Sequence, residues 1–170
     1  MPQPSDPIAV YAVVGTGGSS ALVDVYTRRV PNLLTFGVAV LGLVLAAIHG
    51  TGVSLWSAIG GFALGLVLML PGHIVGATGA GDVKLFAAIG TLLGPTRVGV
   101  AFVYTAIAAG ILAFVVALRR RRLAATVERA GTLVRTAGAN VAEIEQPAQD
   151  NRFAYAPAIA AGTLAAALGL

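Results

Sequence analysis

Two aspartates, Asp24 and Asp82, lie at the edges of apolar stretches, whereas every other acidic residue falls in the N-terminal tail or in one polar segment. A charged side chain at membrane depth costs roughly 2.5 to 3.5 kcal/mol on insertion scales, so it usually lines a cavity where it serves chemistry or transport. Two carboxylates that share one proton can supply both the base and the acid for amide hydrolysis. Asp24 and Asp82 are therefore the candidate catalytic residues.

The composition indicates that these aspartates belong to an integral membrane protein. Of 170 residues, 57% are hydrophobic and 11% are charged, and the mean hydropathy is +0.87. A soluble domain of this size is less apolar. The absence of cysteine excludes disulfides, thiolate zinc sites and a thiol nucleophile.

The pattern of apolar residues predicts an all-α membrane protein with one polytopic domain, residues 1–170, built as a bundle of six transmembrane helices. The fourth candidate has about twelve residues, or roughly 18 Å of helix, and is short for a bilayer. The six apolar stretches are residues 7–23, 33–48, 53–70, 83–94, 98–118 and 153–170.

The basic residues favour a topology in which all six stretches cross. Arg28 and Arg29, Lys84, and the run Arg119 to Arg122 then share one side, and Arg97 stands alone on the other. If the fourth stretch only dips into the membrane, the four-arginine run moves outside. We therefore expect Asp24 and Asp82 to face the same cytoplasmic interface. This topological role also explains the net charge of +4, so we expect no nucleic-acid partner.

The polar segment 119–152 is expected to be a cytoplasmic loop between the fifth and sixth spans. Leu123, Val127, Ala130 and Val134 repeat at helical spacing among arginines. This pattern is typical of a short amphipathic helix that lies on anionic membrane lipids.

Asp82 stands in the string Gly79-Ala80-Gly81-Asp82-Val83-Lys84-Leu85. Gly79 and Gly81 let the backbone approach a substrate closely, so we predict that they shape the site. Asp82 also fits the first turn of a helix as a capping residue. Lys84 is a candidate to steady the charged pair, although the role of an interface anchor is favoured.

Asp24 begins the segment Asp24 to Asn32, which links the first two spans. Pro31 and Asn32 mark a turn before the next helix. Asp24 also stands at helical spacing from Arg28, so an ordinary ion pair in a basic loop is the alternative interpretation.

Together the two motifs resemble those of the bacterial prepilin peptidases, the Gly-x-Gly-Asp class of intramembrane aspartic proteases. In that family an aspartate precedes Pro-Asn by seven residues, as Asp24 does here, and a second follows Gly-x-Gly and precedes Val-Lys-Leu, as Asp82 does. A weaker likeness is the string Tyr155 to Gly162, where the family often has an aromatic residue, a proline and a glycine.

The resemblance implies a leader peptidase of the inner membrane that cuts pilin or pseudopilin precursors, commonly after glycine, without a cofactor or metal. Larger family members carry two Cys-x-x-Cys pairs and also methylate the new N-terminus. This chain has no cysteine, so it resembles the short, peptidase-only enzymes of tight-adherence (Flp) pilus systems, and methyl transfer is not expected.

Two other function classes fit some of the same residues. In a small transporter or channel, Asp24 and Asp82 would bind a proton or cation, but such carboxylates are expected near the bilayer midplane, often in repeated halves. In a non-enzymatic subunit for pilus assembly, both aspartates would tolerate asparagine.

Overall fold

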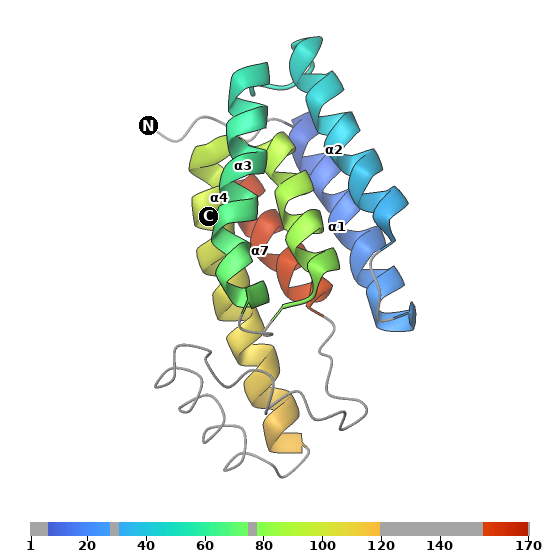
Figure 1. Cartoon of the computed structure of the whole chain (residues 1–170), viewed down its shortest axis with the longest axis vertical. Coiled ribbons are helices and arrows are strands. Elements are labelled where there is room, and N and C mark those ends of the chain that lie inside the picture. The colour runs from blue at the N-terminus through green and yellow to red at the C-terminus, as the bar shows by residue number, and fades with distance from the viewer. Residues whose placement is uncertain (1–6, 28–30, 75–77, 120–154, 170) are drawn as a thin grey trace.

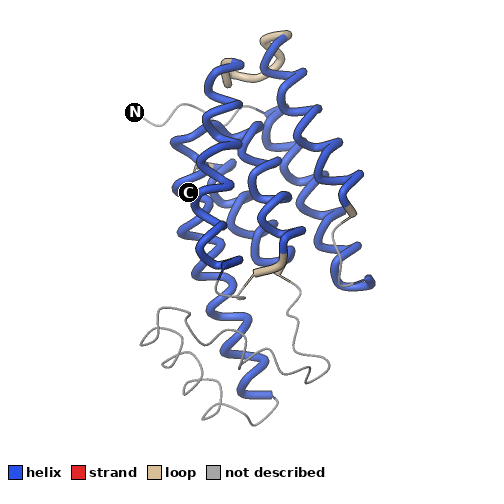
Figure 2. Tube along the Cα trace, viewed as in Figure 1, coloured by secondary structure: helices blue, strands red, loops and turns tan. Residues whose placement is uncertain are grey.

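The computed structural model describes residues 7–27, 31–74, 78–119 and 155–169. This part of the chain is helical apart from short turns, and it contains no strand (Figure 2). The all-α prediction is thus confirmed. The helices are α1 (Pro7–Thr27), α2 (Asn32–Ala47), α3 (Leu55–Ile74), α4 (Ala80–Arg119) and α7 (Ala156–Leu168).

Helix α4 is interrupted at Gly94, whose backbone angles are φ 72° and ψ 170°. This conformation is open almost only to glycine, and Pro95 follows it. The chain reverses direction here, so that residues 80–93 and 95–119 run antiparallel (Figure 1). The fourth and fifth predicted stretches are therefore the two halves of one element.

The helices pack side by side along the long axis of the molecule, with the first half of α4 at the centre (Figure 1). Leu85, Phe86, Ile89 and Leu92 from this half are almost completely buried. The ring of Phe86 contacts that of Phe102 edge to face, with centroids 6.2 Å apart. The helix that carries Asp82 is thus the core helix of the bundle.

Small residues bring α3 and α4 into backbone contact. A Cβ atom added to Gly61 would overlap the carbonyl of Gly90, and one added to Gly65 would lie 2.9 Å from the Cα of Ala87. Gly61 and Gly65, four residues apart, thus let the two helices approach closely. This contact holds α3 tightly against the centre of the bundle.

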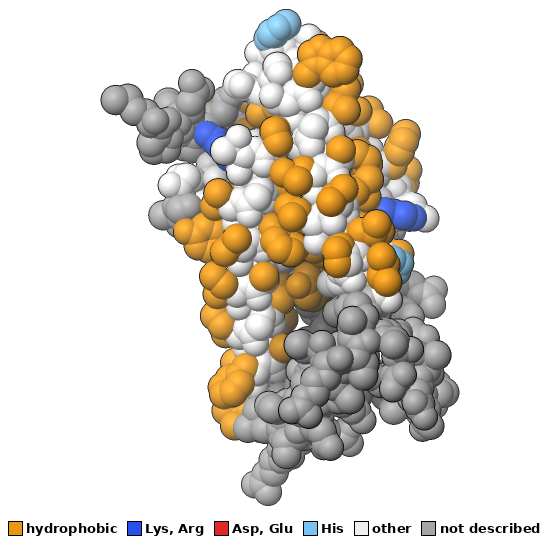
Figure 3. All heavy atoms as spheres, turned by 60° about the vertical axis from the view of Figure 1, so that its left-hand side comes forward, with side chains coloured by type: hydrophobic (Ala, Val, Ile, Leu, Met, Phe, Trp, Pro, Cys, Tyr) orange, Lys and Arg blue, Asp and Glu red, His pale blue; other side chains and the backbone are white. Residues whose placement is uncertain are grey.

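Large apolar side chains cover much of the outer surface. Leu33 is 83% exposed, Trp56 82% and Phe36 70%. Figure 3 shows hydrophobic side chains along the whole length of one face, with few basic and no acidic side chains among the described residues. Such a surface is typical of contact with lipid.

By length and composition, two described segments are apolar enough to cross a membrane: Leu55–Ile74, and Ala80–Val116 counted across the reversal at Gly94. Helices α2 and α7 are apolar but shorter. Six transmembrane spans remain a prediction, and the predicted amphipathic helix and acidic loop between residues 120 and 152 lie outside the described residues.

Helix α3 extends beyond the third predicted stretch, which ended at residue 70. It continues past Pro71 and ends only at Ile74, so His73 lies in its last turn. The ring Nδ1 of His73 lies 3.0 Å from the carbonyl oxygen of Thr78, and the Thr78 N–H donates to the Gly72 carbonyl at 3.1 Å. These contacts fix the end of α3 against the segment that leads into Asp82.

Candidate active site

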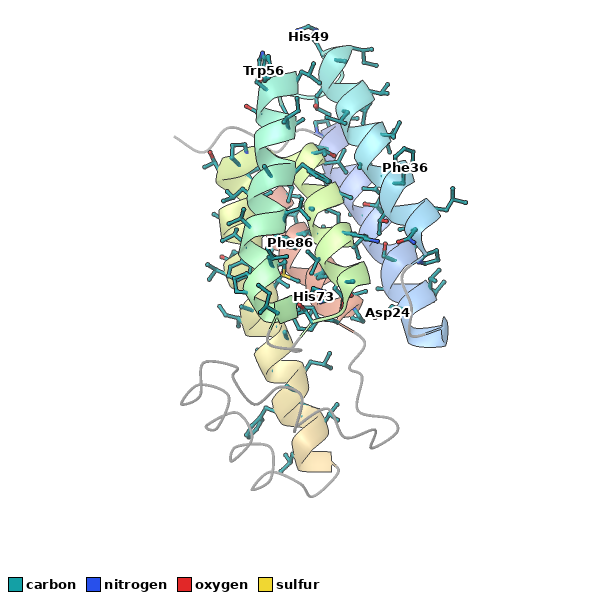
Figure 4. All side chains as sticks on the ribbon, viewed as in Figure 1. Asp24, Phe36, His49, Trp56, His73 and Phe86 are labelled. Carbon is teal, nitrogen blue, oxygen red and sulfur yellow. The ribbon has the colours of Figure 1, made fainter. Side chains whose placement is uncertain are left out.

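Asp24 and Asp82 lie at the same end of the bundle. Asp24 is in the last two turns of α1, and Asp82 is in the first turn of α4. Figure 4 places Asp24 at the end where α3 finishes with His73, and His49 and Trp56 at the opposite end. Only 5% of Asp24 and 8% of Asp82 is exposed, so both carboxylates are withdrawn into the bundle.

The local sequence explains the position of Asp82. Asp82 is the third residue of α4, and its Oδ2 accepts a hydrogen bond of 3.2 Å from the backbone N–H of Gly79. This bond satisfies an N–H that the first turn of a helix leaves without a helical partner. A Cβ on Gly79 would lie 3.1 Å from the same oxygen. The capping interpretation is confirmed, whereas the role of Gly79 in shaping a substrate site stays a prediction.

Asp24 is held by a distant part of the chain. Its Oδ2 accepts a hydrogen bond of 3.2 Å from the backbone N–H of Ala156, 132 residues later and at the first position of α7. The bond is buried. Arg28, the alternative partner for Asp24, lies outside the described residues.

The two carboxylates interact electrostatically. The negative charge of Asp24 acts on Asp82, and the charge of Asp82 acts in turn on the phenol of Tyr155. Two neighbouring carboxylates do not ionise together easily, so one proton tends to be shared between them. This arrangement can supply a base and an acid at the same place.

Lys84 lies apart from this pair. It is exposed, and its Nζ donates a hydrogen bond of 3.1 Å to Oδ1 of Asn32, the first residue of α2. Both residues line a mostly apolar groove of about 490 Å³ between α2 and α3. Lys84 thus joins α4 to α2, and its role as an anchor at the membrane interface stays a prediction. Gly81 lies in the first turn of α4, beside Asp82.

Sequence analysis assigned no role to Ala156. The string that begins at Tyr155 was noted only for its likeness to the family. Because the donor is the backbone N–H of Ala156, no side-chain pattern in the sequence indicates the bond. Proline at the second position of α7 does mark the start of that helix. Within the described residues, no three His, Asp or Glu side chains are placed to hold a metal ion together.

The model of the type IV leader peptidase family matches residues 12–116, which is more than half of the chain. The chain belongs to the type IV leader peptidase family. No curated protein and no solved structure gave a match. The family implies a peptidase, and together with the two long apolar helices it indicates membrane association. The matched region contains both aspartates and ends before α7.

Proposed function

We propose that this member of the type IV leader peptidase family is an aspartic endopeptidase that removes the leader of type IV-like pilin or pseudopilin precursors at the cytoplasmic face of the bacterial inner membrane. Asp24 and Asp82 are its catalytic residues. The observation that carries the proposal is the pair itself: two buried carboxylates, from α1 and α4, whose charges interact at one end of the bundle.

In the proposed reaction, the ionised aspartate takes a proton from a water molecule while the protonated aspartate donates to the scissile carbonyl. The water oxygen bonds to the carbonyl carbon. The C–N bond then breaks as the amine receives the proton that the first aspartate took from water, and the second aspartate recovers its proton from the former carbonyl oxygen. The Oδ2 of each aspartate also accepts a backbone hydrogen bond.

The substrate follows from the family resemblance. We expect a precursor with a basic leader and an apolar helix that lies in the membrane, cut at the junction of the two. A carboxylate pair at the end of a bundle suits this junction, because water reaches it while the apolar helix remains in lipid. We expect neither a cofactor nor transfer of a methyl group to the cleaved product.

The intact mass of a co-expressed Flp-type pilin precursor tests this proposal. The wild type and Ser57→Ala, a change at the opposite end of the bundle, should remove the leader, whereas Asp24→Asn and Asp82→Asn should leave it in place at equal membrane levels. A product heavier by about 14 Da would reveal methylation.

Two results would overturn the proposal. If the precursor remains intact with the wild type, this substrate is wrong. If either asparagine variant still processes it, that aspartate is not catalytic, and a transporter or an assembly subunit becomes the better description. The position of both carboxylates at helix ends, rather than mid-span, already argues against a transporter.

A further inference from the structure

The first turn of α7 touches the candidate active site, although α7 lies beyond the region that the family model matches. The first N–H groups of a helix have no partner within the helix and are left to bind acceptors from elsewhere. At α7, the N–H of Ala156 binds Asp24. Ala156 is fully buried, so this contact is shielded from bulk water.

The position of this turn is fixed by close packing along α7. A Cβ on Gly162 would overlap the side chain and backbone of Thr105 in the second half of α4. A Cβ on Gly17 of α1 would lie 3.3 Å from the Cβ of Ala160. Helix α7 is therefore seated against both α1 and α4, the two elements that carry the aspartates.

The residue before this turn also ties it to the bundle. Tyr155 is half-buried and packs against the hydrophobic core. The start of α7 thus brings a backbone donor and a neighbouring phenol to the end of the bundle that holds both aspartates.

We propose that the first turn of α7 is a positioning element of the active site, in which the Ala156 amide holds the Asp24 carboxylate in place opposite Asp82 and Tyr155 lines the same space. This inference rests on the proposed peptidase function. It adds two positioning residues, Ala156 and Tyr155, that act through the aspartates. It also makes α7 a required part of the catalytic unit.

Hydrogen exchange of the Ala156 amide tests the contact without any activity measurement. In the purified full-length protein this amide should exchange slowly, and Asp24→Asn should keep it slow because an asparagine oxygen still accepts the bond. Asp24→Ala should raise the exchange rate by roughly 10-fold or more, as expected when a hydrogen bond to a charged acceptor is lost. Equal exchange in all three proteins would mean that burial alone protects the amide, and would overturn the proposal.

Kinetics of precursor cleavage test the consequence. Ala156→Pro removes the N–H, whereas Ala156→Gly keeps it and removes only the methyl group. We expect kcat to fall roughly 10- to 100-fold in Ala156→Pro with KM unchanged, and to stay within about threefold of wild type in Ala156→Gly. Equal losses in the two variants would show that packing, rather than the hydrogen bond, matters, and would overturn the proposal.

In Ala156→Pro, the proline itself can distort the turn, because Tyr155 has helical backbone angles that a following proline disfavours. A second variant therefore changes the same turn without introducing a proline. Tyr155→Phe keeps the packed ring and removes only the hydroxyl group. We expect kcat to fall severalfold with KM unchanged, whereas Tyr104→Phe in α4 should match the wild type. An unchanged kcat in Tyr155→Phe would remove Tyr155 from the site. Failure of the wild type to cleave would instead overturn the proposed function, and the exchange experiment would still decide on the contact.

Discussion

The two ends of the bundle are built from the same kinds of helix termini but hold different groups. At one end, the starts of α4 and α7 direct backbone N–H groups to Asp82 and Asp24. At the other end, the chain turns at His49 and Gly94, and the serines of the α2–α3 turn bond each other, with Ser54 and Ser57 oxygens 3.2 Å apart. Asp24 and Asp82 are the two acidic residues of the described part of the chain, and both lie at the first end.

We propose that this difference separates groups that stabilise the fold from groups that serve chemistry. The strained Gly94 and the tightly packed Gly61 and Gly90 lie toward the end without carboxylates, where they let the chain reverse and let α3 touch α4. Buried carboxylates beside each other work against stability, because each disfavours the charge of the other. Substitutions at the end without carboxylates should therefore mainly lower the free energy of unfolding, whereas substitutions of the aspartates should mainly lower kcat.

The largest effect is expected from the aspartates. Asp24→Asn and Asp82→Asn should each reduce kcat by about 10³-fold or more, and the double variant should lose no more than the stronger single variant, because the two residues act as a unit. The unfolding temperature in detergent should not fall, since a charge repulsion is removed. Additive losses in log kcat would show that the two residues act separately.

A large effect on stability is expected from Gly61, which packs toward the end without carboxylates. Gly61→Ala should lower the free energy of unfolding by about 1–3 kcal/mol, because its Cβ would overlap the Gly90 backbone. The neighbouring Gly60 is the matched control, since the atom nearest to an added Cβ there is 3.9 Å away. Unfolding in graded denaturing detergent measures both, and equal stability of the two variants would contradict the observed packing.

Gly94 tests the chain reversal. Gly94→Ala should cost about 1–3 kcal/mol, because a side chain strains a residue with these backbone angles. Gly99→Ala, where nothing lies within 4 Å of an added Cβ, should be neutral. The kcat of the folded fraction should remain at the wild-type value in both variants. A loss of kcat in Gly94→Ala but not in Gly99→Ala would show that a change at the end without carboxylates affects catalysis, which would contradict the proposed difference between the two ends.

The smallest effect is expected from Lys84, which lies at the carboxylate end but faces α2. Lys84→Met keeps the apolar stem and removes the bond to Asn32, so the loss of stability should be below about 1 kcal/mol. Asn32→Ala removes the same bond from the other side and should behave alike. A fall in kcat for Lys84→Met but not for Asn32→Ala would return Lys84 to a role in the site.

Much of the fold and the site could be predicted from the sequence because the signals were local or periodic. The apolar stretches predicted the position of each described helix. The glycines before Asp82 indicated the start of a helix, and the Asp82 carboxylate caps this start by accepting a hydrogen bond from the Gly79 N–H. Asp24 and Asp82 were expected at the same interface, and they lie at one end of the bundle, near the end of α1 and at the start of α4.

What the sequence could not supply were contacts made by the backbone over long distances. The bond from Ala156 to Asp24 involves a donor that every residue except proline has, so the residue type carries no information about it. The two separate stretches 83–94 and 98–118 implied a reversal between them, but not the strain at Gly94, because many of the 22 glycines show no comparable strain. The end of α3 was expected at residue 70, because a proline often terminates a helix, yet this helix continues past Pro71.

The contact between Asp24 and Ala156 also sets an order of events during biosynthesis. The two partners are separated by 132 residues, so at about 5–20 residues per second the amide leaves the ribosome roughly 7 to 26 s after the aspartate. Until α7 has inserted, Asp24 lacks this partner even if α1 and α4 have already met. Under the proposed role of the Ala156 amide, a nascent chain does not act as a protease before its last helix has joined the others.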